Sequence, residues 1–114
     1  MSKDLFIKII NREIPADIVF ENEKILAFRD INPQAPIHIL IIPKEHIETT
    51  DDLRAEHEGI AGQMLLVATE IARKEGLSEK GYRLVMNCKE DGGQMVFHIH
   101  MHLLGGRPML WPPG

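Results

Sequence analysis

The segment Val96-Phe97-His98-Ile99-His100-Met101-His102-Leu103-Leu104 alternates histidine with apolar side chains. Successive side chains of a β-strand point to opposite faces of the sheet. We therefore predict a strand over residues 96–104. Its apolar positions would face the core, and its other face would carry His98, His100 and His102.

Shorter β-prone runs bounded by turn residues predict the rest of the sheet. They lie over residues 18–20, 25–28, 37–42 and 82–86. Asp91-Gly92-Gly93-Gln94 is expected to be a glycine-rich loop that leads into the histidine segment. Five strands joined largely by hairpins are typical of a five-stranded antiparallel sheet.

Apolar residues three and four positions apart predict two helices. The short helix covers about residues 4–12, with Ser2 or Asp4 available as its cap, and the long helix runs from Leu53 to Gly76. With the sheet, one long and one short helix predict an α+β fold. The apolar surface of the long helix is broad enough to be buried on two sides, one against the sheet and one against a second subunit. It includes Ala61, Leu65, Leu66, Ala68 and Ala72.

Length and composition limit the class of protein. The 114 residues, 44% hydrophobic and 26% charged, suit one globular domain over residues 1–114. The net charge of -4 and the scattered Lys and Arg residues argue against nucleic acid as the main partner. No apolar run approaches the roughly 20 residues that span a bilayer. The start of the chain lacks a secretory signal pattern, so no membrane partner and a cytoplasmic location are expected.

The lone Cys88 allows no internal disulfide and no four-cysteine zinc site. The histidine row itself admits three interpretations. It could be a solvated polar row on a half-exposed sheet. It could also bind a metal. Residues i and i+2 of a strand lie about 6.6 Å apart and residues i and i+4 about 13 Å apart, whereas two nitrogens on one zinc lie about 3–4 Å apart. One ion cannot easily bind all three, although a pair could share an ion with His38 or His46.

The third interpretation is nucleophilic catalysis. A neutral imidazole can attack without a separate base, and neighbouring imidazoles can orient it, contact phosphate oxygens and deliver a proton. Gly92-Gly93-Gln94, just before the row, offers backbone N–H groups that can surround an anion. A lone Gly-Gly pair is usually only a turn, but next to the histidines it adds weight to an anion-binding interpretation.

The pattern His-x-His-x-His resembles the signature of the histidine triad family. Similar segments cover nearly the whole chain: residues 6–10, 13–16, 27–31, 33–38 and 92–94. The ending, Gly105-Gly106-Arg107-Pro108-Met109-Leu110-Trp111-Pro112-Pro113-Gly114, looks like that of the Hint branch of the family. The resemblance implies a homodimer whose two sheets join into one of ten strands. It also implies hydrolysis of purine nucleoside 5'-phosphoramidates to the nucleoside monophosphate, with neither metal nor cofactor.

The resemblance also implies roles for individual residues. His100 would be the nucleophile, and His98 would touch phosphate and hold His100 in its working tautomer. His102 and His38 would complete the network, and Asp30 would bind the ribose hydroxyls. Walls around the base are implied for Leu5, Phe6, Ile9, Phe28 and Ile31, and phosphate contacts for Asn87 and the N–H groups of Gly93, Gln94, Met95 and Val96.

Some of these residues have plainer interpretations. Leu5, Phe6 and Ile9 could simply be core, and Asp30 could be a turn former. Met95 stands where similar proteins often carry Ser or Thr, so no hydroxyl is available there for the leaving group. Arg29 could add a charge near the nucleotide. A dinucleoside polyphosphate hydrolase of the same family and a nucleotide-binding module without catalysis are the alternative functions.

Overall fold

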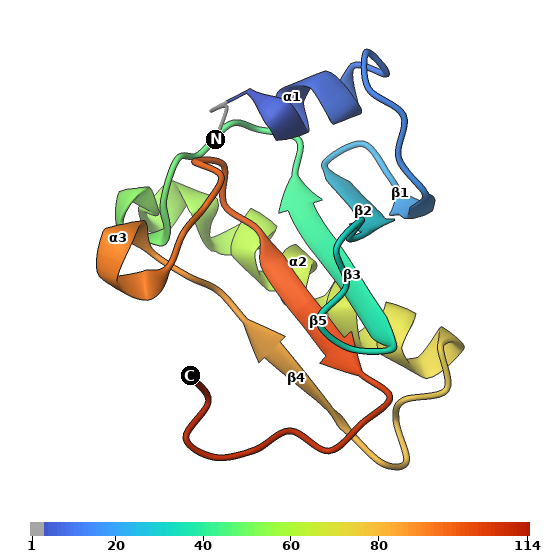
Figure 1. The fold of residues 1–114 in the computed structure, drawn as a ribbon. Helices are drawn as coiled ribbons and strands as arrows, with labels where there is room; N and C mark the ends of the chain where they lie inside the picture. The colour runs from blue at the N-terminus through green and yellow to red at the C-terminus, as the bar shows by residue number, and fades with distance from the viewer. Residues whose placement is uncertain (1–3) are drawn as a thin grey trace.

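The computed structural model describes residues 4–114, so the cap expected from Ser2 lies outside the described part. Five strands form one antiparallel sheet in the order β1-β2-β3-β5-β4 (Figure 1). They are β1 (Ile18–Glu21), β2 (Ile25–Arg29), β3 (Ile37–Pro43), β4 (Tyr82–Val85) and β5 (Met101–Gly105). The predicted α+β fold is confirmed.

The helices are α1 (Leu5–Ile10), α2 (Glu58–Lys74) and the single-turn α3 (Lys89–Gly92). The helix α2 starts later than predicted because two 3₁₀ turns, η1 (Thr50–Asp52) and η2 (Ala55–His57), precede it. Asp4 occupies the N-cap position of α1 without a side-chain cap hydrogen bond. The prediction of a loop over residues 91–94 is partly wrong, since Asp91 and Gly92 belong to α3. The loop begins at Gly93, whose φ of 79° ends that helix.

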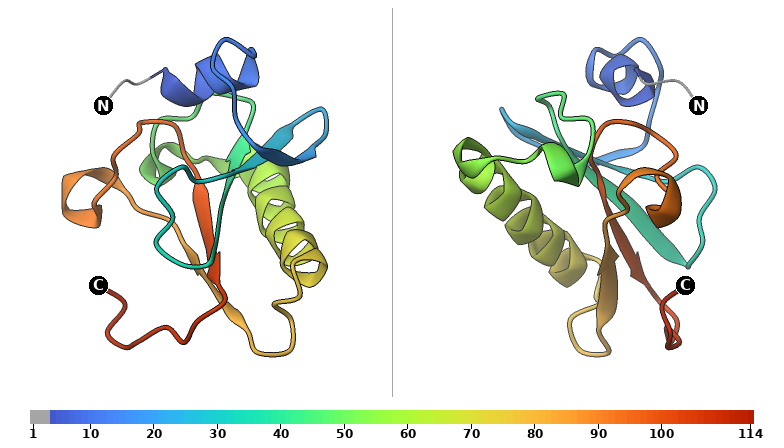
Figure 2. Two further views of the ribbon diagram at one scale, coloured as in Figure 1. Left: turned by 45° about the vertical axis from the view of Figure 1, so that its right-hand side comes forward. Right: turned by 90° about the vertical axis from the view of Figure 1, so that its left-hand side faces the viewer.

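The two faces of the sheet carry separate apolar clusters. One cluster lies under α2, where Ile25, Ala27, Ile39 and Ile41 of β2 and β3 meet the buried side of the helix. The alternate residues of the same strands meet Phe6 and Ile9 of α1 on the opposite face. Figure 2 shows α2 lying along one face of the sheet and α1 standing apart from it. Because side chains alternate along a strand, the sheet has two different faces. The long helix α2 covers one of them, and α1 covers only one end of the other.

The predicted strand over residues 96–104 is shorter in the structure. Its β ladder begins at Met101, because residues 96–98 form a bend and the N–H of Ile99 donates to the carbonyl of Ile47 at 2.8 Å. Only His102 of the three histidines lies in β5. Strand alternation therefore does not determine the side-chain directions of His98 and His100. In the structure these two rings have different neighbours.

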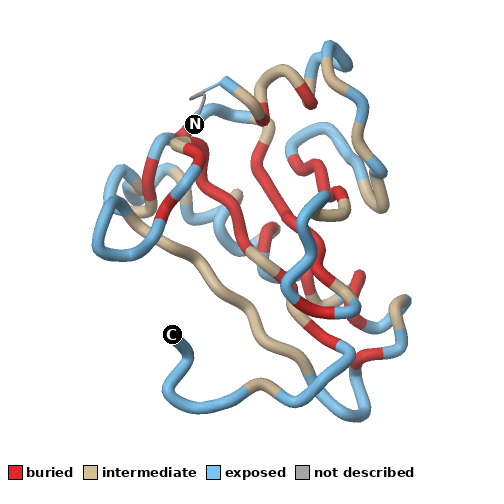
Figure 3. Tube along the Cα trace, in the orientation of Figure 1, coloured by how far each residue is buried: buried red, intermediate tan, exposed pale blue. Residues whose placement is uncertain are grey.

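Burial is concentrated in the middle of the sheet. Figure 3 shows β3 buried along most of its length, whereas β4 at the edge is of intermediate burial throughout. In α2, Ala68 and Ala72 belong to the core, while Leu65 and Leu66 are exposed. Ala68 and Ala72 therefore pack on the sheet side of the helix, and Ala61, Leu65 and Leu66 are left exposed on the side predicted to meet a second subunit. Among residues 4–114, no helix is both long and apolar enough to span a bilayer.

Candidate active site

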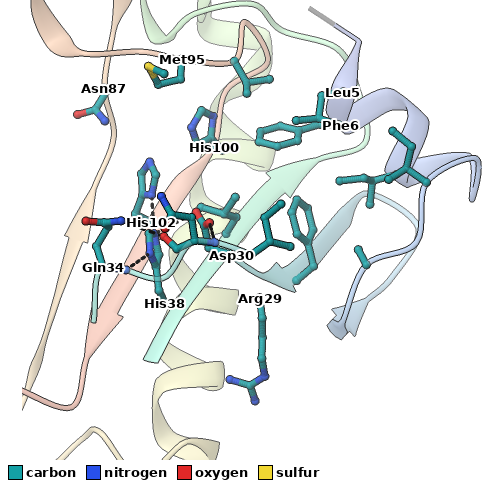
Figure 4. Close-up of a pocket in the computed structure, with 18 of the residues that line it drawn as sticks. Leu5, Phe6, Arg29, Asp30, Gln34, His38, Asn87, Met95, His100 and His102 are labelled. Atoms are coloured by element: carbon teal, nitrogen blue, oxygen red, sulfur yellow. Dashed lines mark hydrogen bonds and ion pairs between the residues drawn. The ribbon is translucent and has the colours of Figure 1, made fainter. Parts of the chain in front are cut away.

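A pocket of about 450 Å³ opens on the sheet face that carries α1 (Figure 4). Its apolar end is formed by Leu5, Phe6 and Ile9 of α1 with Phe28 of β2. The rings of Phe6 and Phe28 meet edge to face, with centroids 5.6 Å apart. Phe6, Ile9 and Phe28 are also buried members of the second core cluster. Phe6 and Ile9 are therefore both core residues and part of the pocket wall.

The polar end contains His38 of β3 and His102 of β5. The main-chain N–H of Gln34 donates to Nδ1 of His38 at 3.0 Å, so the proton of a neutral His38 lies on Nε2. Nε2 of His38 lies 2.9 Å from Nδ1 of His102, and its N–H donates there. His102 then carries its own proton on Nε2. The chain from Gln34 to His102, drawn as dashed lines in Figure 4, leaves one N–H donor on His102 for a ligand.

His100 has the opposite tautomer. Its Nδ1 lies 2.8 Å from the carbonyl oxygen of His98, which can only accept, so Nδ1 carries the proton. Nε2 of His100 therefore holds a free lone pair. The ring packs edge to face against Phe6 at 5.0 Å and against His102 at 4.9 Å between centroids. These contacts hold the unprotonated Nε2 of His100 in the pocket wall.

Burial keeps these imidazoles neutral. It lowers the pKa of His100 below the ordinary 6.5, while the hydrogen bond to the His98 carbonyl and the negative charge of Asp30 act in the other direction. Burial, helped by the neighbouring imidazoles, lowers the pKa of His102 to about 4. The pKa of His38 is lowered as well, again through burial. At pH 7 the three rings are neutral, as the tautomer assignments require.

Asp30 directly follows β2, and its two carboxylate oxygens make different contacts. Its Oδ1 accepts from the N–H of Asn32 at 2.8 Å, which makes it the turn former expected from its place before a proline loop. Its Oδ2 lies 3.5 Å from Nε2 of His38, and the residue lines the pocket. The carboxylate thus borders the polar end while its turn holds the following loop.

Comparison with known proteins places this geometry in a family. A sequence model of the HIT domain matches residues 11–109. The chain belongs to the HIT family. It is 60% identical over 105 residues to "Purine nucleoside phosphoramidase" of Escherichia coli K12, which covers 92% of this chain and 88% of that enzyme.

Two further proteins are similar to this chain over nearly its whole length. The "14 kDa zinc-binding protein" of Zea mays is 57% identical over 115 residues, which cover 99% of this chain and 89% of that protein. A solved structure of a HIT family hydrolase from Legionella pneumophila superposes with a TM-score of 0.95 at 58% identity, covering 96% of this chain and 98% of that one.

In this HIT domain His98 does not line the pocket. Its side chain is fully buried, its Nε2–H donates to the carbonyl of Pro43 at 2.7 Å, and His46 stacks on it with centroids 5.1 Å apart. The expected contact of its side chain with phosphate is therefore wrong. The expected positioning role is supported by its main chain, because the His98 carbonyl accepts from His100.

Arg29 also differs from expectation. Its guanidinium forms two hydrogen bonds with the Glu75 carboxylate, at 3.2 and 3.0 Å, and its Nε lies 3.6 Å from Asp17. Figure 4 shows the side chain of Arg29 pointing away from Asp30. The residue borders the pocket but its charge is used to join β2 to the end of α2.

Most of the other predicted residues meet at the pocket. Asn87, Gly93, Met95 and Val96 line the side near His100, and Ile31 lines the rim with an exposed fraction of 98%. The side chain of Gln94 is buried outside the pocket, where its Nε2 donates to the carbonyls of Glu48 and Val96. Gln94 thus shapes the loop, and its main-chain N–H is used there as well, because it donates to the carbonyl of Lys89 at 3.0 Å. The phosphate contact expected of this N–H is therefore wrong.

Sequence reasoning missed six residues that line the pocket, which are Ile14, Pro15, Ala16, Asn32, Gln34 and Leu40. Leu40 shares the pocket face of β3 with His38, and the alternation of that strand was the signal for it. Gln34 acts through its main-chain N–H, which carries no signal in residue type.

Asp30, His38 and His102 could also hold a metal ion, since one ligand atom from each lies within 4.8 Å of the others. The sequence-based metal interpretation invoked two histidines of the row with His38 or His46. The rings of His38, His100 and His102 are neighbours, but among the described residues no such set of three histidines places its ligand atoms within 4.8 Å of one another. Nε2 of His38 and Nδ1 of His102 already share a hydrogen bond. An ion held by these two nitrogens would replace that bond, so metal binding and the tautomer chain exclude one another.

Proposed function

We propose that this chain hydrolyses purine nucleoside 5'-phosphoramidates to a nucleoside 5'-monophosphate and an amine. The observation that carries the proposal is the pair of opposite tautomers at the pocket: a lone pair on Nε2 of His100 beside an N–H donor on Nε2 of His102. A nucleophile and a donor side by side suit attack on a phosphorus centre. The relative from Escherichia coli, named for this activity, supports the choice of substrate.

The pocket has a matching end for each part of such a substrate. The purine lies against Leu5, Phe6 and Phe28, where apolar walls suit a flat aromatic base. The ribose hydroxyls donate to the Asp30 carboxylate. The phosphate oxygens accept from Nε2–H of His102, from Asn87 and from the main-chain N–H groups of Met95 and Val96. The N–H groups of Gly93 and Gln94 already donate to the carbonyls of Glu90 and Lys89. Ile31 covers the base from the rim.

The reaction takes two displacements at phosphorus. The lone pair on Nε2 of His100 forms a bond to the α-phosphorus while the bond from phosphorus to the amine nitrogen breaks. The departing nitrogen takes that electron pair and a proton from solvent at the open rim. Water then attacks phosphorus and releases a proton, the bond to Nε2 breaks, and its electron pair returns to the imidazole. Throughout, Nδ1–H of His100 keeps its hydrogen bond to the His98 carbonyl, which stabilises the charge on the ring.

Replacing the nucleophile tests the proposal. We expect His100→Ala to lower kcat for adenosine 5'-phosphoramidate by at least about 10³-fold, because no other lone pair faces the phosphorus. Binding of AMP should be retained, since the base and ribose contacts remain. Single-turnover reactions of the unchanged protein, quenched and examined by mass spectrometry, should show a nucleotide bound to His100. Near-normal turnover by His100→Ala would contradict the assignment.

The same assay separates the alternatives. A dinucleoside polyphosphate hydrolase would turn over diadenosine polyphosphates faster than the phosphoramidate. A nucleotide-binding module would bind AMP and give no nucleotidyl-histidine. We expect the phosphoramidate to be the better substrate by kcat/KM.

The proposal includes a homodimer in the cytoplasm. β4 lies at the edge of the sheet, so its outer backbone groups are available to pair with a second copy of β4 and form ten continuous strands. Leu65 and Leu66 of α2 are exposed, with fractions of 47% and 69%, and would be covered in such a pair. Cys88 is a free thiol, as suits a reducing compartment.

A further inference from the structure

Residues 46 and 47, which follow β3, hold the bend that precedes β5. Nε2–H of His46 donates to the carbonyl of Phe97 at 2.9 Å. The ring of His46 stacks on that of His98, with centroids 5.1 Å apart and an angle of 24° between the ring planes. The carbonyl of Ile47 accepts from the N–H of Ile99 at 2.8 Å. Each of the three successive residues 97–99 therefore contacts this short segment, where the β ladder between β3 and β5 has ended.

These contacts fix the direction of the His98 carbonyl. A peptide group is planar and trans, so the carbonyl of His98 points opposite to the N–H of Ile99. The hydrogen bond of that N–H orients one of the two peptide planes that meet at His98. The bond from His46 to the Phe97 carbonyl orients the other plane. With both planes held, the backbone angles of His98 are set, and its carbonyl accepts Nδ1–H of His100 at 2.8 Å.

The side chain of His98 has a single hydrogen bond. Its Nε2–H donates to the carbonyl of Pro43, and its buried Nδ1 has no hydrogen-bond partner among residues 4–114. The plane of the ring is therefore held by its neighbours, with His46 on its face and Phe6 edge to face at 5.9 Å between centroids. His46 is nevertheless exposed, so it can be replaced without opening a cavity in the core.

We propose that His46 is a positioning residue for the reaction: its N–H holds the bend so that the His98 carbonyl keeps Nε2 of His100 unprotonated and directed into the pocket. This inference rests on the proposed function. His46 does not line the pocket, so it touches neither the substrate nor the reacting atoms. Without its N–H, the peptide plane before His98 can turn, and His100 can adopt its other tautomer, in which Nε2 carries a proton and cannot attack. The base and ribose contacts stay in place.

Three variants separate the N–H donor from the ring. His46→Ala removes both, His46→Phe keeps a ring on His98 without a donor, and His46→Gln places an amide N–H near the former Nε2. We expect His46→Ala and His46→Phe to lower kcat for adenosine 5'-phosphoramidate by about 10- to 100-fold, because a misdirected nucleophile reacts slowly. His46→Gln should restore kcat to within about threefold of the unchanged protein. The Kd of AMP should change by less than about twofold in all three.

A second measurement needs no turnover. Nitrogen-15 NMR of the imidazole rings distinguishes a protonated from an unprotonated nitrogen, and His100 of the unchanged protein should show a protonated Nδ1 and an unprotonated Nε2. In His46→Ala and His46→Phe the two resonances should move toward each other as the second tautomer becomes populated.

Glu45→Ala is the matched control. It shortens the exposed side chain just before His46, whose carboxylate lies 3.4 Å from Nε2 of His57. This variant should leave kcat and the His100 resonances unchanged. Urea denaturation followed by circular dichroism establishes that each variant is folded, and His46→Phe and His46→Gln keep the comparison if His46→Ala is not.

The outcomes distinguish the two proposals. If the His46 variants keep the kcat and the His100 resonances of the unchanged protein, the inference fails while the proposed function stands. Equal losses in His46→Gln and His46→Phe would also overturn the inference, because the N–H donor would not be the cause. If the unchanged protein does not hydrolyse the phosphoramidate, the proposed function fails and takes the inference with it. A low kcat with mixed tautomers in His46→Phe, and recovery of both in His46→Gln, support the positioning role.

Discussion

Backbone groups decide which nitrogen of each imidazole carries the proton. The N–H of Gln34 donates to His38, and the carbonyl of His98 accepts from His100, so two rings in one pocket wall have opposite tautomers. Side-chain partners could themselves exchange protons, whereas these main-chain groups cannot. The lone pair on Nε2 of His100 and the N–H donor on Nε2 of His102 are therefore set before any ligand binds.

The pH dependence of the reaction follows from the same environment. A protonated His100 cannot attack, and burial lowers its pKa below 6.5. We expect kcat/KM to be level between pH 7 and 8 and to fall only as the pH drops through this lowered pKa. Asp30→Asn removes a negative charge that raises the pKa of His100, so it should move the fall to still lower pH. An NMR titration of the His100 ring measures the shift independently of turnover. A fall that moved to higher pH would contradict this account.

At the scale of the elements, β5 depends on a close approach to the turn after α2. A Cβ built on Gly105 would lie 2.6 and 2.8 Å from the two δ-carbons of Leu77, which is buried in the core cluster under α2. We expect Gly105→Ala to lower the free energy of unfolding by about 1–3 kcal/mol, because the buried Leu77 has to move. Urea denaturation followed by circular dichroism measures the change.

A second glycine gives the matched control. Gly62 lies within α2 and a Cβ there would meet nothing within 4 Å. Gly62→Ala should raise the free energy of unfolding by about 0.5–1 kcal/mol through helix propensity alone. Equal effects of the two substitutions would show that the contact with Leu77 is not the cause.

At the scale of the whole molecule, the proposed dimer can be tested through α2. The exposed Leu66 is outside both core clusters, so Leu66→Glu should leave the fold intact and weaken a dimer that covers this side chain. Light scattering should give about twice the 13.0 kDa of one chain for the unchanged protein and a mass nearer one chain for the variant. Lys80→Glu, an exposed charge reversal, serves as the control. A single-chain mass for the unchanged protein would overturn the dimer.

The sequence by itself determined the strands, the two main helices and most of the residues around the pocket. Runs of β-prone residues in β2 and β3 and helical spacing in α2 are local signals, so residue order was sufficient to find these elements. The resemblance carried by the histidine segment supplied His38, His100, His102 and Asp30 as site residues.

Only the tertiary structure decided where each imidazole points. The bend at residues 96–98 ends the strand alternation, so His98 enters the core and packs on His46 while its carbonyl orients His100. Arg29 is turned away from the site by Glu75, which lies 46 residues along the chain. These outcomes depend on contacts between distant segments and on main-chain hydrogen bonds, and neither is encoded in local residue type.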